Sequence, residues 1–138
     1  MRLFAYGTLM FPEILDAVAG TVPMAGTPAR LHGFSRRAVR GEAYPAIVPQ
    51  PLAQVPGMLW SGLPETCLGR LDAFEGSEYR RQRRLLVTAD GLRLTAWCYV
   101  LRDELRGTLA PHDWSCARFR SSYLDSYLLA LRRRGGSP

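Results

Sequence analysis

The sequence predicts an α+β fold, a mixed and mostly antiparallel small β-barrel with flanking helices. Two observations support this prediction. Short strand-like segments outnumber helical ones, about six or seven against three, and the two kinds do not alternate strictly along the chain. A doubly wound parallel sheet requires such alternation, whereas Asp90-Gly91 between two apolar segments signals an antiparallel hairpin. We therefore expect a mixed sheet that curls into a barrel.

The N-terminal residues predict a buried strand, a turn and a short helix. Residues 3–6 are apolar and are followed by Gly7, a pattern typical of a strand that leads into a turn. Pro12 suits the first turn of a helix over residues 12–18, because the N–H that proline lacks has no helical partner there. Gly20 is expected to end this helix.

The middle of the chain predicts three strands and a second helix. A short strand is expected near residues 29–31, between turns that contain glycine and proline. Residues 44–49 have strand character, but two prolines restrict them to an edge strand or a strand end. A further strand covers residues 55–60, and a helix is expected over residues 64–74.

The C-terminal third predicts a hairpin followed by one long helix. Strands over residues 83–89 and 92–101 flank the Asp90-Gly91 turn signal. A single amphipathic helix is expected over residues 113–134, because apolar residues recur there at helical spacing. Asp113 is its expected N-cap.

The totals indicate a single domain. Residues 1–134 are predicted to form it, and residues 135–138 a loose tail. The 138 residues suffice for a core of their own, and shares of 47% hydrophobic and 22% charged residues are ordinary for a globular protein. No apolar segment approaches the ~20 residues of a membrane span, and residues 1–4 lead into a strand pattern rather than a signal peptide. We therefore expect a cytoplasmic protein without a membrane partner.

Charge and ligand-forming residues weigh against several partner classes. All 18 basic residues are arginine and the net charge is +6, but the arginines are spread over separate segments without interleaved aromatic residues, which argues against nucleic acid. Three cysteines and two histidines show neither disulfide nor zinc spacing, so we expect structural thiols and no metal site. The sequence also lacks glycine-rich nucleotide motifs, and no cofactor is expected.

Two segments could carry chemistry. Glu75 follows a helix-like run and precedes Gly76, and partial burial there would raise its pKa toward the range needed to move a proton at neutral pH. The Tyr6-Gly7-Thr8-Leu9 turn, which follows an apolar strand, could hold a carboxylate through its backbone N–H groups. Taken alone, the same residues also fit a solvated glutamate at a helix end and an ordinary strand-to-helix turn.

Five segments occur in an order and spacing that resemble a known family. They are Phe4-Ala5-Tyr6-Gly7-Thr8-Leu9, Gly33-Phe34, Tyr44-Pro45-Ala46, Gly57-Met58-Leu59-Trp60 and Leu71-Asp72-x-x-Glu75-Gly76-x-x-Tyr79. Together they resemble the gamma-glutamylcyclotransferase-like superfamily, including its plant avirulence-induced branch. The resemblance implies a mixed α/β barrel with flanking helices. It also implies an enzyme that releases 5-oxoproline from a small gamma-glutamyl substrate without a cofactor.

The resemblance also implies roles for individual residues. Glu75 would act as general base and then general acid. The α-carboxylate of the gamma-glutamyl unit would be held by the backbone of a four-residue turn, Tyr6, Gly7, Thr8 and Leu9. Gly7 would allow close approach and a sharp turn with positive φ. Tyr79 either lines the pocket or donates to the substrate, or it is an aromatic residue on a strand surface; these alternatives stay open.

Neighbouring residues bear on the same site. Glu78 is expected at the surface. Arg81 lies on the same strand face as Tyr79 and could pair with Glu75, but this would lower the pKa of the carboxylate and oppose its action as a base. The leaving group would be selected at a pocket mouth built from residues 32–44 and 101–113.

Three functions therefore compete. An enzyme requires Glu75 in a pocket close to the turn. A non-catalytic binding module for a small acidic metabolite would keep the turn, with Glu75 in a salt bridge or exposed. A basic protein associated with RNA or DNA would gather its arginines on one surface. The sequence defines neither the leaving group nor the oligomeric state.

Overall fold

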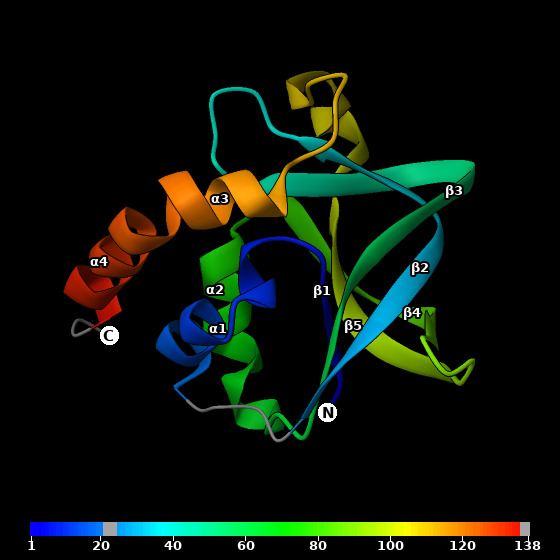
Figure 1. Ribbon diagram of the computed structural model, residues 1–138, viewed down its shortest axis with the longest axis horizontal. Helices are drawn as coiled ribbons and strands as arrows, with labels where there is room; N and C mark the ends of the chain where they lie inside the picture. Colours follow the sequence, from blue (N-terminus) through cyan, green and yellow to red (C-terminus); the bar gives the residue numbers. More distant parts are fainter. Residues whose placement is uncertain (21–24, 136–138) are drawn as a thin grey trace.

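The protein is a closed β-barrel with helices on one side, as the computed structural model shows for residues 1–20 and 25–135 (Figure 1). Its strands are β1 (Leu3–Ala5), β2 (Ala25–Ala38), β3 (Pro45–Ser61), β4 (Tyr79–Thr88) and β5 (Arg93–Leu101). They neighbour one another in the order β1-β3-β2-β4-β5, and β1 closes the barrel by pairing in parallel with β5. The other pairs are antiparallel. The predicted mixed, mostly antiparallel barrel is confirmed.

Strands β2 and β3 are much longer than expected. The strand expected near residues 29–31 belongs to a β2 of 14 residues, and those expected over residues 44–49 and 55–60 are parts of one β3 of 17 residues. The expectation of six or seven short strands was therefore wrong. The pairing shifts register just after His32, and in the adjoining stretch of β3 Leu52 has φ 71° and a fully exposed side chain. In the sequence pattern, this local irregularity cannot be told from a break between two separate strands.

The predicted hairpin at Asp90-Gly91 is confirmed. Gly91 has φ 88°, and its N–H donates to the carbonyl oxygen of Thr88 at 2.9 Å. The register runs from Val87 opposite Arg93 to Tyr79 opposite Leu101. Strand β4 thus begins earlier than the predicted residue 83, which places Tyr79 inside the barrel wall.

The first two predicted helices are present. Helix α1 (Pro12–Ala19) follows the 3₁₀ turn η1 (Thr8–Met10), and it ends at Gly20, whose φ is 76°. The second helix begins with the 3₁₀ turn η2 (Glu65–Cys67) and continues as α2 (Leu68–Glu75). A further 3₁₀ segment, η3 (Asp103–Thr108), lies after β5.

The expected single C-terminal helix is two helices, α3 (Cys116–Ser122) and α4 (Leu124–Gly135). They part at Tyr123, whose φ of −127° is not helical. The N-cap of α3 is Ser115, which accepts a hydrogen bond from the Arg118 N–H at 3.1 Å, and not Asp113. Gly135 closes α4 instead of opening the loose tail; the rest of that tail, residues 136–138, lies outside the described residues.

Two hydrophobic clusters fix the position of β1. One fills the barrel and includes Phe4 and Leu86, and the other lies between the barrel and the helices and includes Leu3, Ala5 and Phe119. Alternation along β1 sends Phe4 inward and its two neighbours toward the helices. The chain therefore leaves β1 at the junction between barrel and helices. Among the helices described, none combines the length and apolar character needed to cross a bilayer.

Candidate active site

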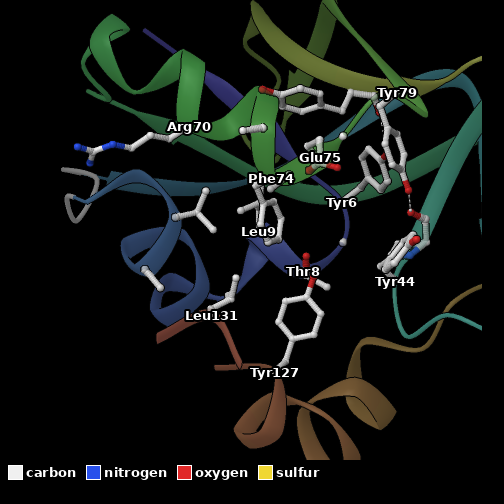
Figure 2. Close-up of a pocket in the computed structure, with 18 of the residues that line it drawn as sticks. Tyr6, Thr8, Leu9, Tyr44, Arg70, Phe74, Glu75, Tyr79, Tyr127 and Leu131 are labelled. Atoms are coloured by element: carbon white, nitrogen blue, oxygen red, sulfur yellow. Dashed lines mark hydrogen bonds between the residues drawn. The ribbon is translucent and has the colours of Figure 1, made fainter. Parts of the chain in front are cut away.

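A cavity of about 1070 Å³ lies where β1 ends, bordered by α1, α2 and α4 (Figure 2). Its wall contains the six residues to which the sequence assigned catalysis or substrate binding, namely Tyr6, Gly7, Thr8, Leu9, Glu75 and Tyr79. These residues come from the turn after β1, the end of α2 and the start of β4. The fold thus brings the expected carboxylate and the expected turn to one cavity.

Glu75 is the last residue of α2 and is partly buried. The helix stops there because Gly76 has φ 83°, a backbone conformation that favours glycine. Buried Leu71, one turn earlier, anchors the helix in the core. Burial, and secondly the negative charge of Glu78, raises the pKa of Glu75 to about 8. Within the described part of the chain, its carboxylate has neither an ion pair nor a hydrogen bond.

The turn after β1 holds backbone donors that have no acceptor. The Met10 N–H donates to the carbonyl oxygen of Gly7 at 3.0 Å, but the N–H groups of Gly7, Thr8 and Leu9 find no acceptor in residues 1–20 or 25–135. The Leu9 carbonyl accepts a hydrogen bond from the Trp60 indole at 3.0 Å, which fixes the far end of the turn. Successive free N–H groups of this kind form a site for an anion.

The expectation that Gly7 adopts positive φ was wrong. Its φ is −128°, which other residues can also adopt. Glycine is required there by close packing, because a Cβ atom would lie 2.8 Å from Cγ of Pro45. The turn therefore approaches the start of β3 too closely for any side chain.

Two tyrosines of the cavity wall donate to backbone carbonyls. The Tyr6 hydroxyl donates to the carbonyl oxygen of Tyr99 at 2.6 Å, and the Tyr79 hydroxyl donates to that of Pro45 at 2.9 Å (Figure 2). Burial, together with nearby groups that include Glu75, raises the pKa of both phenols, so they stay neutral. Tyr79 lines the cavity and is buried, which rules out the alternative of a surface aromatic residue.

Arg81 does not pair with Glu75. Its Nε donates to Oδ1 of Asp72 at 2.9 Å, and its guanidinium lies over the Trp97 ring, 4.3 Å from the centroid. We call Arg81, Asp72 and Trp97 the helix cluster, because Asp72 belongs to α2. The Tyr99 hydroxyl also donates to Asp72, at 2.7 Å. The positive charge is thus held one turn away from Glu75.

Several wall residues could not be found from the sequence. Residues 101–113 were expected at the pocket mouth, but they do not line the cavity, and of residues 32–44 only Tyr44 does. The place expected for them is taken by α4, which contributes Tyr127 and Leu131. Tyr127 points toward Thr8 (Figure 2). Both residues belong to the apolar stripe of the predicted amphipathic helix, and nothing in its periodicity separates a core face from a cavity wall.

Other reactive groups near the site are unsuited to chemistry of their own. Burial, and then the charge of Glu75, raises the pKa of Cys98, so this cysteine stays a neutral thiol and not a nucleophilic thiolate. Across the described residues, no group of three or more His, Cys, Asp or Glu side chains could hold a metal ion. Glu75 is therefore the group in the cavity best suited to proton transfer.

Comparison with known proteins identifies the family. The model of the family described as gamma-glutamyl cyclotransferase, AIG2-like, matches residues 3–116. The chain belongs to this family. AIG2-like protein B of Arabidopsis thaliana is 34% identical over 138 residues, which cover 96% of this chain and 79% of that protein.

Solved structures show the same fold. A solution structure of another Arabidopsis thaliana protein superposes with a TM-score of 0.71 at 23% identity, and covers 96% of this chain and 88% of that one. A structure of a protein named gamma-glutamyl cyclotransferase gives a TM-score of 0.63 at 17% identity, with 96% and 86% of the two chains covered. The barrel and its helices are thus those of the gamma-glutamyl cyclotransferase fold.

Proposed function

We propose that the protein is a gamma-glutamyl cyclotransferase that converts a small gamma-glutamyl amide into 5-oxoproline and a free amine. The observation that carries this proposal is the position of Glu75. Its pKa is raised to about 8, and it lines the same cavity as residues 7–9, whose N–H groups have no acceptor among the described residues. A carboxyl group that gains and loses a proton near neutral pH can act as base and then as acid.

The reaction balances without an external reactant. The α-amino nitrogen of the substrate attacks its own γ-carbonyl carbon, so a C–N bond forms and closes a five-membered ring. The C–N bond to the leaving amine then breaks. The α-ammonium nitrogen loses two protons in becoming the lactam N–H. Glu75 accepts them one at a time and passes both to the departing nitrogen, which leaves as an ammonium ion. Both nitrogen atoms come from the substrate, and Glu75 returns to its starting state.

The raised pKa of Glu75 matches the group that must lose the proton. An α-ammonium has a pKa of ~7.8 in the absence of neighbouring groups. Glu75, with a pKa of about 8, can therefore accept that proton and return it with little loss of free energy. An ordinary surface glutamate is too weak a base for this exchange. The bound ammonium cation would itself favour the ionised form of the carboxyl group.

The turn of residues 6–9 supplies the positioning that the reaction requires. Its free N–H groups would hold the α-carboxylate of the substrate, so that the amino group lies toward Glu75. The buried phenol rings of Tyr6 and Tyr79 close the wall around them. Holding the flexible gamma-glutamyl chain in a folded conformation removes entropy that the ring closure would otherwise lose in the transition state.

The comparisons support a reaction of this class. The family description names gamma-glutamyl cyclotransferase, and one solved structure with the same fold carries that name too. The alternative, a binding module for a small acidic metabolite, would use the same turn. Its expectation that Glu75 is paired or exposed does not fit the unpaired, partly buried carboxylate in the described residues.

A product assay tests the proposal. The protein is incubated with a panel of gamma-glutamyl dipeptides and gamma-glutamyl amines, and 5-oxoproline is measured in parallel for Glu75→Gln. We expect product from at least one compound and a loss of kcat of at least ~100-fold in the variant. Glu65→Gln, which changes an exposed glutamate outside the cavity, serves as the control and should keep full activity.

The same assay distinguishes the alternative. If the protein binds 5-oxoproline or a gamma-glutamyl compound in calorimetry but forms no product from any member of the panel, the binding module is correct. Product formation that survives Glu75→Gln unchanged would remove Glu75 from the mechanism.

A further inference from the structure

Arg36 makes contacts with both the substrate turn and a distant loop. Its Nε and Nη2 donate to the two carboxylate oxygens of Asp113, at 2.8 and 3.1 Å. Its remaining nitrogen, Nη1, donates to the carbonyl oxygen of Tyr6 at 2.8 Å. The guanidinium also lies over the ring of Trp114, 5.4 Å from its centroid. We call Arg36, Asp113 and Trp114 the turn cluster.

The turn cluster is anchored independently of the turn. Arg36 lies near the end of β2, where the next residues pair with the loop that carries Asp113: Ala38 donates to the carbonyl of His112 at 3.0 Å and accepts from Ala110 at 2.8 Å. The indole of Trp114 donates to the carbonyl of Ala43 at 2.7 Å. The Arg36 side chain is only 10% exposed. Its position is thus fixed by contacts with residues outside the turn.

The contact with Tyr6 determines where the Gly7 N–H points. The carbonyl of residue 6 and the N–H of residue 7 belong to one planar trans peptide group, in which they point in opposite directions. Because Arg36 holds the carbonyl oxygen, the Gly7 N–H leaves the peptide on the side away from Arg36. That N–H has no acceptor among the described residues, and Gly7 lines the cavity.

We propose that Arg36 is a positioning residue, which orients the Tyr6–Gly7 peptide so that the Gly7 N–H faces the α-carboxylate of a bound ligand. This inference rests on the proposed function, in which the turn holds that carboxylate. The guanidinium has a second effect: its positive charge polarises the peptide group and makes the N–H a stronger donor to an anion. Arg36 itself lies behind the peptide and does not line the cavity.

Arginine is the residue type that this arrangement requires. Its planar fork can bind both oxygens of Asp113 and still present a third nitrogen to the Tyr6 carbonyl. A lysine at the same position could contact one of these partners at a time. We therefore expect Arg36→Lys to recover part, but not all, of what Arg36→Gln loses.

The test compares two substrates in two variants. One substrate is the best gamma-glutamyl compound of the panel, and the other is the same compound with its α-carboxylate replaced by a carboxamide. We expect the ratio of kcat/KM for acid over amide to fall about tenfold in Arg36→Gln, mainly through KM, as for one weakened charge-assisted hydrogen bond. Arg81→Gln is the matched control, because Arg81 also pairs with an aspartate and lies over a tryptophan. It should leave the ratio unchanged.

The ratio separates positioning from general damage to the fold. A merely structural loss would lower kcat/KM for both substrates by the same factor, and an unchanged ratio in Arg36→Gln overturns the proposal. If Arg36→Gln does not fold, Asp113→Asn gives a milder change. It removes the charge that holds the guanidinium but leaves Arg36 in place, and it should lower the ratio in the same direction.

A second measurement does not depend on catalysis. The backbone amide resonance of Gly7 in the free protein is recorded by ¹⁵N–¹H spectroscopy for the unmodified chain, Arg36→Gln and Arg81→Gln. We expect the Gly7 resonance to move only in Arg36→Gln, because the peptide that contains it loses its partner. If the chain forms no 5-oxoproline and Gly7 still moves, the proposed function fails while the positioning role survives. A Gly7 resonance that stays in place overturns the positioning role.

Discussion

The turn cluster and the helix cluster have the same composition, an arginine that pairs with an aspartate and lies over a tryptophan ring. They differ in the third nitrogen of the guanidinium. In the turn cluster, Nη1 of Arg36 donates to the Tyr6 carbonyl at 2.8 Å. In the helix cluster, Arg81 donates to Asp72 alone among the described residues. The first arginine is also less exposed, with 10% of its side chain accessible against 26%.

This difference shows that one motif performs two tasks around one cavity. The turn cluster acts on the backbone and directs a donor toward an anion. The helix cluster acts through charge: it neutralises Asp72 and keeps the guanidinium away from Glu75, whose pKa can then stay raised. The cavity thus has fixed donors on one part of its wall and an unpaired carboxyl group on another.

The largest change in stability is expected from Glu75→Gln, which removes the carboxyl group that the helix cluster leaves unpaired. The pKa of Glu75 rises on folding from 4.5 to about 8, so the folded state disfavours the carboxylate. Below pH 4.5 the raised pKa therefore does not lower the stability of the unmodified chain. As the pH rises toward 8, the unmodified chain loses stability relative to the variant. Linkage sets an upper limit of about 5 kcal/mol, and partial exposure to the cavity lowers the expected difference to about 2–4 kcal/mol.

Thermal unfolding of both proteins between pH 5 and pH 8.5 measures this difference. The melting temperature of Glu75→Gln should exceed that of the unmodified chain by a gap that widens with pH and levels off above pH 8. A gap that stays constant across this range would mean that Glu75 titrates normally. The proposed proton transfer would then lose its physical basis.

The next largest effect is expected from Gly7→Ala, which disturbs the backbone that the turn cluster orients. The new Cβ would lie 2.8 Å from Cγ of Pro45, so the turn or the start of β3 has to move. We expect a loss of about 1–3 kcal/mol in the free energy of unfolding. Because the N–H groups of the turn move as well, KM for the gamma-glutamyl substrate should rise.

Denaturant unfolding and steady-state kinetics check this prediction. Gly69→Ala is the control, since a Cβ there has no atom within 4 Å and the residue lies in α2. It should stabilise the protein by up to about 1 kcal/mol through helix propensity. If Gly7→Ala is as stable and as active as Gly69→Ala, close packing against Pro45 does not constrain the turn.

The contrast between the clusters also explains which parts of the protein could be predicted from sequence. The carboxylate and the turn lie in local patterns: Glu75 sits between a helical run and Gly76, and Gly7 follows an apolar strand. The partners of the two arginines could not be predicted in this way. Arg36 meets Asp113 across 77 residues of chain, and the sequence instead suggested Asp113 as a helix cap. Such contacts depend on how the barrel closes.

The fold shows the same division. The hairpin at Asp90-Gly91 and the helix that starts at Pro12 were predicted, because turn and cap residues act within a few positions. The sequence did not predict that two expected strands join into β3, because the local irregularity of β3 at Leu52 resembles a loop. The wall that α4 adds to the cavity depends on tertiary packing alone, and helical periodicity cannot reveal it.

A smaller effect is expected from Asp72→Asn, which converts the helix cluster into a source of free positive charge. Asp72 and Glu75 lie three residues apart on one face of α2, so the released guanidinium of Arg81 can turn to Glu75. Pairing would lower the pKa of Glu75 and occupy its oxygen atoms. We expect kcat at pH 9 to fall about three- to tenfold, and the acidic limb of the kcat/KM profile to move to lower pH.

The pH–rate profile of the double variant Asp72→Asn/Arg81→Gln tests the cause. Removing the arginine should return the acidic limb of the kcat/KM profile and the value of kcat at pH 9 toward those of the unmodified chain. The reason is that the two substituted positions are coupled through the positive charge of Arg81. If the double variant remains as slow as Asp72→Asn alone, the aspartate acts by holding α2 in place and not by retaining the guanidinium.

The smallest effect is expected from Glu78→Gln, which changes the charge near Glu75 without offering it a partner. Glu78 is exposed and raises the pKa of Glu75 through repulsion, so its removal should move the acidic limb to lower pH. At pH 7 a larger fraction of Glu75 is then ionised, and kcat/KM should increase about two- to threefold, the size of a weak surface interaction.

Because salt screens exposed charges, this gain should shrink in 1 M salt. Glu42→Gln, a change at an exposed glutamate that does not affect the pKa of Glu75, should give no gain. A gain in kcat/KM that persists in high salt would mean that the substitution rearranges the cavity. Glu78 would then not act on Glu75 by repulsion at a distance, and the contrast with direct pairing to Arg81 would fail.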